Sequence, residues 1–243
     1  MATLMGKRIL VIGGSSGIGL GVATAALDKG ADVVIVGRSQ EKLQAAERAL
    51  AAAGKISTFA ADMTQEAEIA RLFAGIGGLD HLVSTAGTPP PGYPIGDTDL
   101  NVVRGFIDNK LVGAVLVAKY AVRTLKKGGS MTFTSGINKD KPPVPGGSVV
   151  AAIAGSFSYF AHALSLELAP TRVNVVSPGW VDTPMFTELA GENKSSLFES
   201  MATRLPVGRI AKPADVALAY VYAMESEFTT GQTLHIDGGQ SLI

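Results

Sequence analysis

A run of small residues near the start of the chain has the composition and spacing of a phosphate-binding turn. Gly13-Gly14-Ser15-Ser16-Gly17-Ile18-Gly19 follows a short apolar segment, Arg8–Ile12, and opens a helical pattern. Gly13 permits a tight turn, Gly17 lets the backbone approach a pyrophosphate, and Gly19 allows the helix to pack closely on the strand. The alternative is a tight turn without a ligand. The residues expected to contact phosphate through helix N–H groups and hydroxyls are Gly13, Ser15, Ser16, Gly17, Ile18 and Gly19.

The end of the next apolar segment indicates which dinucleotide would bind. The segment ends Val36-Gly37-Arg38-Ser39. An acidic residue there would bind the ribose 2′-hydroxyl of NAD, whereas an arginine accommodates the 2′-phosphate of NADP. Gly37 leaves the acidic position empty, and Arg38 with Ser39 can bind phosphate through charge-assisted hydrogen bonds. NADP(H) is therefore the expected cofactor and NAD(H) stays possible; the alternative is that Arg38 is a solvated residue at a helix start.

Alternating strands and helices must position these motifs. The expected strands are Arg8–Ile12, Asp32–Val36, Ile56–Ala60, His81–Ser84, Ser130–Thr134, Arg172–Ser177 and Thr233–Ile236. The expected helices are Gly17–Lys29, Gln40–Ala53, Glu66–Phe73, Asn101–Lys126, Val149–Ala169 and Pro213–Met224. The strands are nearly continuous runs of Val, Ile and Leu, which is typical of a parallel sheet buried on both faces.

Strand–helix–strand alternation predicts a three-layer α/β fold, a doubly wound parallel sheet of the Rossmann type with about seven strands. Ligands of such sheets bind beyond the C-terminal ends of the strands. At 243 residues, we expect a single dinucleotide-binding domain over residues 1–243.

The amino-acid composition limits which classes of binding partner and which cellular compartment we expect. Lys+Arg and Asp+Glu are balanced at 21 each, so the chain has no electrostatic footprint for nucleic acid or an anionic membrane. Cysteine is absent, which excludes disulfides, thiolate metal sites and a cysteine nucleophile, and fits a reducing compartment. The first residues lack signal-peptide features, and no apolar run is expected to reach the roughly 18 residues that span a bilayer. We expect a cytoplasmic protein without a metal.

Four further motifs resemble the short-chain dehydrogenase/reductase family, and the likeness covers nearly the whole chain. Ala61-Asp62-Met63 matches the position of the family's adenine-contacting Asp, and Ser84-Thr85-Ala86-Gly87 resembles its Asn-Asn-Ala-Gly turn. Ser177–Met185 resembles the loop whose Pro-Gly backs the nicotinamide and whose Thr binds the carboxamide, and Thr230–Gly239 matches the C-terminal signature. Ile12 stands where the family has Thr. The resemblance adds as cofactor contacts Asp62, Met63, Ala86, Gly87, Pro178, Gly179, Val181, Thr183 and Met185.

The proton-transfer pair of the family has no counterpart in this sequence. In the family a Tyr exchanges the substrate proton, and a Lys four residues later, on the same helix face, lowers the pKa of the phenol and binds the nicotinamide ribose. Counted back from the matching helix end, these positions hold Val150 and Ala154. Residues 142–166 contain no Asp, Glu, Lys or Arg, and none of the five tyrosines has Lys or Arg four residues later. The standard relay is therefore expected to be absent.

Lys110 and Ser135 are the candidates to replace this pair. Alignment on Gly113 puts Lys110, preceded by Asn109, in the position of the family's fourth-helix Asn. Its amine could bind the ribose or protonate the product, with a pKa lowered by burial; the alternative is an ordinary surface or interface lysine. The family's catalytic Ser falls at Ser135 or Gly136. Ser135 could orient a substrate atom, or simply bind backbone at the strand end.

These expectations favour an NADP(H)-dependent oxidoreductase with a non-standard proton relay. The cofactor carries the hard chemistry, so an activated carbonyl or imine-type substrate would need little acid help. Apolar residues at helical spacing over 184–204 predict a lid for a possibly apolar small molecule, or segments that pack on the domain. The alternative function is a non-catalytic NADP(H)-binding homologue acting as a sensor or partner subunit. The resemblance also implies a homodimer or homotetramer.

Overall fold

Seven parallel strands form one twisted sheet in the order β3-β2-β1-β4-β5-β6-β7, as the computed structural model shows for residues 4–87, 89 and 92–243. The strands are β1 Arg8–Ile12, β2 Asp32–Gly37, β3 Ile56–Ala60, β4 Leu79–Ser84, β5 Leu125–Thr134, β6 Arg172–Pro178 and β7 Thr233–Ile236. The chain runs outward from β1 to β3 and then returns to β4 on the other side of β1. This reversal makes a crevice at the carboxyl ends of β1 and β4, and the predicted doubly wound fold is confirmed.

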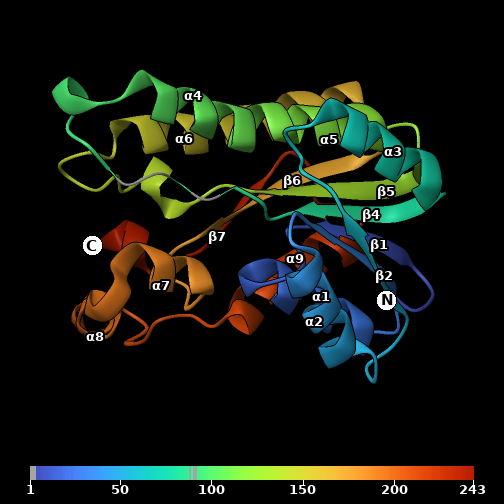
Figure 1. Cartoon of the computed structure of the whole chain (residues 1–243), viewed down its shortest axis with the longest axis horizontal. Helices are drawn as coiled ribbons and strands as arrows, with labels where there is room; N and C mark the ends of the chain where they lie inside the picture. The colour runs from blue at the N-terminus through green and yellow to red at the C-terminus, as the bar shows by residue number, and fades with distance from the viewer. Residues whose placement is uncertain (1–3, 88, 90–91) are drawn as a thin grey trace.

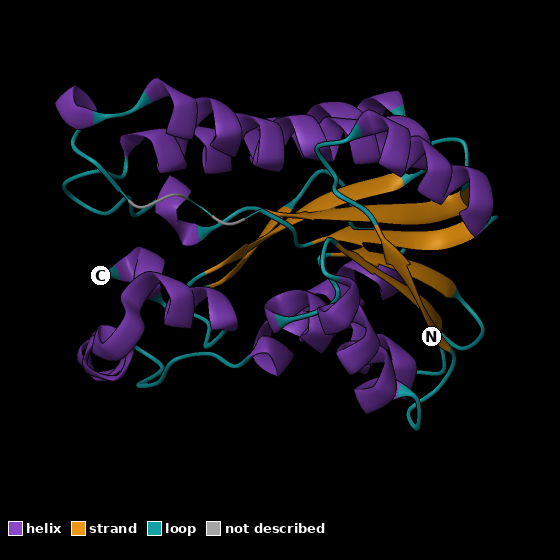
Figure 2. Cartoon of the chain, in the orientation of Figure 1, coloured by secondary structure: helices purple, strands orange, loops and turns teal. Residues whose placement is uncertain are grey.

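Helices cover both faces of the sheet (Figure 1). They are α1 Gly17–Asp28, α2 Gln40–Leu50, α3 Glu66–Ile76, α4 Leu100–Ile107, α5 Gly113–Ala121, α6 Ser148–Glu167, α7 Pro184–Ala190, α8 Lys194–Arg204 and α9 Pro213–Glu225. One apolar core joins α1, α2 and α9 to the sheet, and a second joins α3, α5 and α6 to the opposite face. Figure 2 shows the strands enclosed between these two helical layers, with the short helices α7 and α8 beyond the sheet near the C-terminus.

Burial on both faces explains why the strands lack polar alternation. Every residue of β6 is buried, and in β1 only Arg8 is partly exposed. Removing a Val, Ile or Leu side chain from water contributes roughly 1.5–3 kcal/mol, so a strand between two layers gains from apolar residues at successive positions. The rigid strands thus present their carboxyl-end loops at fixed positions around the crevice.

The single helix expected over Asn101–Lys126 is wrong in its interior and at its end. α4 and α5 are separated by a π-helical turn, Asp108–Val112, which contains Lys110. The helix ends at Ala121 because Leu125 already pairs with Leu79 in the parallel ladder, and so belongs to β5. Periodicity could not reveal this boundary, since the pairing partner of Leu125 is distant in sequence. π-helical turns inside helices are frequent at functional sites.

α6 corrects the expectation that no apolar segment is long enough to span a membrane. Its 20 residues have a mean hydropathy of 1.5, so by length and composition alone it passes that test. In the structure α6 packs on the sheet, where Phe157 and Ala161 join the apolar core, and 33% of its apolar window is buried. Core helices can pass the same test, because burial against a sheet favours apolar residues as a membrane does.

Candidate active site

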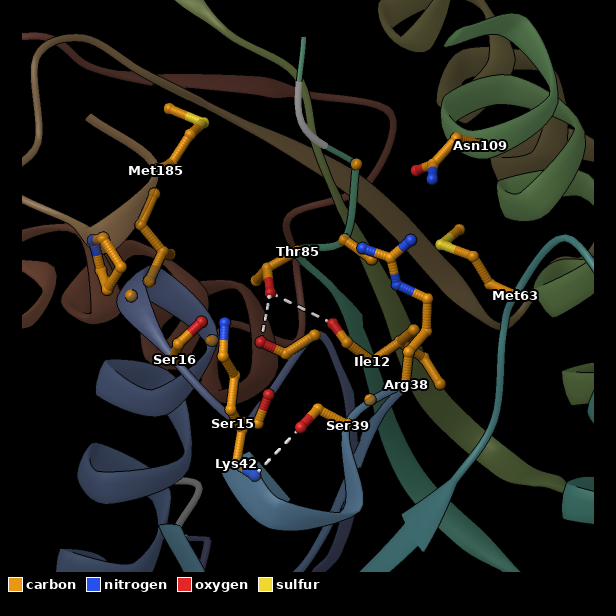
Figure 3. Close-up of a pocket in the computed structure, with 18 of the residues that line it drawn as sticks. Ile12, Ser15, Ser16, Arg38, Ser39, Lys42, Met63, Thr85, Asn109 and Met185 are labelled. Atoms are coloured by element: carbon orange, nitrogen blue, oxygen red, sulfur yellow. Dashed lines mark hydrogen bonds between the residues drawn. The ribbon is translucent and has the colours of Figure 1, made fainter. Parts of the chain in front are cut away.

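A cavity of about 850 Å³ lies at the crevice where the strand order reverses (Figure 3). The glycine turn after β1, the residues following β2 and β3, and the turn after β4 form its inner walls. Residues of α4 and α7 line its other end. The fold therefore brings segments far apart in the sequence around one elongated space at the carboxyl ends of the strands.

The glycine turn has the geometry of a dinucleotide cradle. Gly13 and Gly17 have φ values of 82° and 53°, a region that favours glycine. A Cβ atom at Gly13 would lie 2.7 Å from the Thr85 hydroxyl oxygen. Ser16 caps α1 without a side-chain hydrogen bond, and the first helical residues Gly17, Ile18 and Gly19, whose N–H groups have no partner among the described residues, line the cavity. These groups fit a pyrophosphate, which would sit against the positive end of the helix dipole.

Thr85 holds this turn from the neighbouring strand. Its hydroxyl lies 3.1 Å from the carbonyl oxygen of Ile12 and 3.3 Å from that of Gly13, and both contacts are drawn in Figure 3. The family resemblance had marked Ile12 as a lost threonine and Thr85 as a lost asparagine. The structure shows that a threonine hydroxyl still bonds the turn, but from the β4 side.

We call the end of the cavity after β2 and β3 the adenosine end, because the resemblance assigns the adenine contact to Asp62 there, and this end carries two cations. Arg38 and Lys42 both line it, together with Ser39, whose Oγ accepts a hydrogen bond from the backbone N–H of Lys42. Within the part of the chain that the structure describes, neither cation has an ion-pair partner. A Cβ at Gly37 would lie 3.0 Å from Ser15 Oγ, so an acidic side chain at this position would have to displace that serine.

Lys42 was missed by the sequence interpretation. The available signal was a second cation close to Arg38 in the sequence, in the first turn of the helix that Ser39 caps.

Most of the cofactor contacts expected from the sequence line this one cavity. They are Gly13, Ser15, Ser16, Gly17, Ile18, Gly19, Arg38, Ser39, Asp62, Met63, Ala86, Gly87, Thr183 and Met185.

Pro178, Gly179 and Val181 differ from this expectation, since they are not lining residues. Pro178 still pairs with Ile236 at the end of β6, and a Cβ at Gly179 would lie 2.8 Å from the Asp237 Cα. Val181 is buried in the core and bridges to Ala211. Backbone pairing with Ile236 and Ala211 continues through these positions past the end of β6, and the chain reaches the cavity at Thr183.

Lys110 is buried beside the cavity and does not line it. Its side chain is 6% exposed, its Nζ donates to the Ala86 carbonyl at 3.1 Å, and it lies 5.3 Å from the centre of the Phe157 ring. Burial lowers the pKa of this ammonium from 10.5 to about 8. Phe157 is one turn beyond Ala154, so the amine lies further along α6 than the vacated lysine position. Through Ala86, it supports the turn that forms the cavity wall.

Ser135 and the α6 face beside it offer no free proton donor. The Ser135 hydroxyl donates to the main-chain carbonyl of Ala154 at 2.7 Å. Val150 and Ala154 are both buried, and Val150 packs with Ile153 and Phe106 in a small apolar cluster. The positions that the resemblance aligns with the Tyr and Lys are therefore apolar and buried, and they do not line the cavity.

α4 contributes one further wall that sequence reasoning missed. Val102, Gly105, Phe106 and Asn109 line the cavity, and their spacing of three, four and seven residues places them on one helix face. This periodicity was visible in the sequence.

The expected lid, 184–204, consists of α7 and α8 joined by a short 3₁₀ turn, Gly191–Asn193. Its aromatic residues pack on the loop after β6. The Phe186 ring stacks on that of Trp180 with 5.0 Å between the ring centres, and Phe198 meets Trp180 edge-on with 6.1 Å between the ring centres. Pro184, Met185 and Glu188 of α7 line the cavity.

Comparisons with known proteins agree with this geometry. A family model described as Enoyl-(Acyl carrier protein) reductase matches residues 13–241. The short-chain dehydrogenase/reductase ATR9 of Stachybotrys chlorohalonatus is 35% identical, with 100% of each chain covered. The short-chain dehydrogenase/reductase malC of Malbranchea aurantiaca is 31% identical over 98% of this chain and 96% of its own.

Two solved structures extend the likeness to three dimensions. The MalC reductase/Diels-Alderase from Malbranchea aurantiaca superposes with a TM-score of 0.90 at 30% identity, covering 99% of this chain and 98% of its own. A small-chain dehydrogenase solved in complex with NADPH gives a TM-score of 0.85 at 30% identity, covering 98% of this chain and 100% of its own. The phosphate cradle, the doubly wound sheet and these full-length relatives establish that the chain belongs to the short-chain dehydrogenase/reductase family.

Proposed function

We propose that this protein is an NADP(H)-dependent reductase that acts on an activated carbonyl or imine-type small molecule without the usual Tyr–Lys relay. The observation that carries the proposal is the contrast between the two ends of the cavity. The adenosine end holds Arg38, Ser39 and Lys42, whereas at the other end the lining residue Phe106 packs on Val150 in an apolar cluster. The first set favours a bound phosphate, and the second favours a substrate that needs little acid catalysis.

The preference for NADP(H) over NAD(H) rests on charge and on space. Arg38 and Lys42 have no protein counter-ion among the described residues and face the same space as the Ser39 hydroxyl. Charge-assisted hydrogen bonds from two cations suit a phosphate better than a neutral hydroxyl. Gly37 leaves no room for a ribose-binding carboxylate unless Ser15 moves. One relative, solved in complex with NADPH, supports this direction.

Bound NADPH would supply a hydride, and the protein would supply orientation and exclusion of water. Thr85 fixes the glycine turn, Thr183 and Met185 line the cavity beside it, and the α4 face closes the opposite wall. Lys110 is our candidate proton source for substrates that need one, because an ammonium with a pKa of about 8 can give up a proton near neutral pH. Its Nζ would first have to leave the Ala86 carbonyl, since Lys110 does not line the cavity. Its bond to the Ala86 carbonyl also makes it a positioning residue for the turn.

Two measurements test this function. Fluorescence titration with NADPH and NADH should show tighter binding of NADPH, and the absence of binding by either would remove the proposal. NADPH oxidation would then be screened across simple ketones, enones and cyclic iminium ions, with turnover expected for the activated compounds and little for simple ketones.

A second candidate, a non-catalytic NADP(H)-binding homologue, is favoured by one specific observation. Both candidate catalytic groups, the Ser135 hydroxyl and the Lys110 ammonium, are bonded to backbone carbonyls. Tight NADPH binding combined with no oxidation by any compound of the screen would select this alternative.

We also propose a homo-oligomer, as the resemblance implies. The outer surfaces of α5 and α6 expose Val115, Tyr159 and Leu166 to 45%, 81% and 72%. Apolar side chains gathered on two neighbouring helices favour burial against a second copy. Light scattering on the purified chain would distinguish a dimer or tetramer from a monomer.

A further inference from the structure

One carboxylate lies at the end of the cavity lined by α7, which we call the lid end. Four charged residues line the cavity within the described part of the chain, and Arg38, Lys42 and Asp62 all lie at the adenosine end, after β2 and β3. The fourth is Glu188, an exposed residue of α7. A negative charge in this position can act on whatever molecule occupies the space between α7 and α4.

Glu188 has no hydrogen-bond or ion-pair partner among the described residues, although a lysine lies near it. A second cavity of about 430 Å³, beside the first, is lined by Glu188 and also by Lys194 and Asp182. Lys194 already pairs with Asp182 at 2.6 Å and with the Thr187 hydroxyl at 3.1 Å, and it lies 5.3 Å from the centre of the Phe198 ring. Lys194 is thus paired with other groups, and no described residue neutralises the charge of Glu188.

The wall opposite Glu188 is uncharged. On the α4 side the lining residues are Val102, Gly105, Phe106 and Asn109, and Phe106 belongs to the apolar cluster with Val150. In Figure 1, α4 and α7 lie on opposite sides of the space beyond the sheet. Lys110, in the π-helical turn after α4, is buried and bonded to the Ala86 carbonyl, and Arg104 of α4 is not a lining residue. An apolar wall facing a single free carboxylate complements an apolar organic cation.

We propose that Glu188 selects cationic substrates, namely organic iminium ions, by pairing with their positive charge at the lid end of the cavity. This inference names the substrate class of the proposed reductase and rests on that function.

The chemistry of an iminium ion fits the missing proton relay. The carbon of the C=N⁺ group gains a hydride ion from the nicotinamide reductant, the π electrons become a lone pair on nitrogen, and the reductant is oxidised by two electrons. An N-alkylated iminium becomes a neutral tertiary amine in this step, so no proton is consumed. The reaction therefore needs neither the Tyr nor the Lys that Val150 and Ala154 replace.

The same balance predicts which kinetic constant depends on Glu188. The substrate is cationic, and its charge disappears as the hydride is transferred. A carboxylate stabilises the bound substrate at least as much as the transition state, so Glu188 should lower KM without raising kcat. A group that served only as a proton donor would instead change kcat and the pH profile.

The test compares Glu188→Gln with Glu199→Gln, which removes the same charge from an exposed position of α8 outside the cavity lining. The probes are the N-methyl dihydroisoquinolinium ion and its neutral analogue of similar size, tetralone. Calorimetry measures their binding to the NADP⁺-loaded protein, and steady-state NADPH oxidation gives kcat and KM. NADPH affinity is measured separately by fluorescence.

Glu188→Gln should weaken binding of the cation and raise its KM by roughly three- to tenfold, with kcat within about twofold. Tetralone binding and NADPH affinity should not change. Glu199→Gln should behave as the wild type, and Glu188→Asp, which keeps the charge, should retain most of the preference.

Four results would overturn the inference. Equal effects on the cation and on tetralone would make Glu188 a steric element of the wall. Tighter NADPH binding in Glu188→Gln, with unchanged cation binding, would place the carboxylate against the diphosphate. Reduction of an enone by a wild type that neither binds nor reduces the cation would refute this inference alone, whereas failure to bind NADPH would remove the proposed function and this inference together.

Discussion

The hydroxyl of Ser135, at the end of β5, donates a hydrogen bond to the main-chain carbonyl of Ala154 in α6 at 2.7 Å. The resemblance assigns Ala154 to the position of the family's lysine, and Ser135 or Gly136 to that of its catalytic serine. In this chain they are joined to each other, and the bond ties the end of the strand to the helix beside the cavity. The hydroxyl hydrogen is thereby directed at the backbone and away from the cavity.

Replacement of Ser135 by Ala should therefore affect stability more than chemistry. Loss of one hydrogen bond to a buried carbonyl should cost about 1 kcal/mol in the free energy of unfolding. We expect kcat for an activated substrate to fall by less than roughly threefold, since the proposed reaction does not depend on this hydroxyl. Urea denaturation and steady-state NADPH oxidation measure the two effects. A fall of roughly a hundredfold or more in kcat with unchanged stability would make Ser135 a catalytic residue.

Thr85→Val should loosen the glycine turn, because it removes the hydroxyl that bonds the carbonyls of Ile12 and Gly13. The substitution keeps the shape of the side chain, so the loss is confined to the hydrogen bonds. We expect NADPH affinity to fall by about three- to tenfold, in line with one or two neutral hydrogen bonds. Thr85→Ser should restore most of it. Equal affinities of Thr85→Val and the wild type would show that Thr85 does not preorganise the turn.

Arg38→Ala and Lys42→Ala should each reduce the preference for NADPH over NADH by about tenfold, because each removes a cation from the adenosine end of the cavity. Affinity for NADH should change little. The matched control is Arg48→Ala, which removes an exposed cation from the last turn of the same helix, away from the cavity lining. Fluorescence titration with both nucleotides gives the ratio. If Lys42→Ala leaves this ratio unchanged, Lys42 is a solvated residue and Arg38 carries the preference.

Lys110→Met should change how stability depends on pH. Burial lowers the pKa of Lys110 from 10.5 to about 8, so between these values the unfolded chain binds a proton that the folded chain does not. Stability of the wild type should therefore rise as the pH increases through this window, and below about pH 8 the buried charge costs on the order of 3 kcal/mol.

Without the amine this dependence disappears, so the stability of Lys110→Met relative to the wild type should be greatest near neutral pH and should shrink towards about pH 10. Denaturant midpoints at several pH values provide the measurement. If the stabilities of the two proteins changed with pH in parallel, the buried Lys110 would not have a lowered pKa.

Local sequence determined the sheet and the phosphate turn. The strands β1, β3 and β7 begin and end where the apolar runs indicate, because a parallel strand buried on both faces leaves a distinctive run of branched apolar residues. The glycine turn was equally clear, since only glycine tolerates its positive φ at Gly13 and Gly17. These signals are local, and so they survive in the sequence alone.

The boundary of α5 and the positions of Lys110 and Glu188 were decided by tertiary structure. The helix ends before β5 because Leu125 pairs with Leu79 in the sheet, a partner that no local pattern identifies. Lys110 is buried because a π-helical turn and the packing of α4 and α5 beside α6 aim its side chain at Ala86 and Phe157. Glu188 is a solvated residue by every sequence criterion, and only the placement of α7 opposite α4 gives its charge a cavity to act on. The sequence thus determines what each segment can form, whereas the meeting of distant segments determines which side chains share a site.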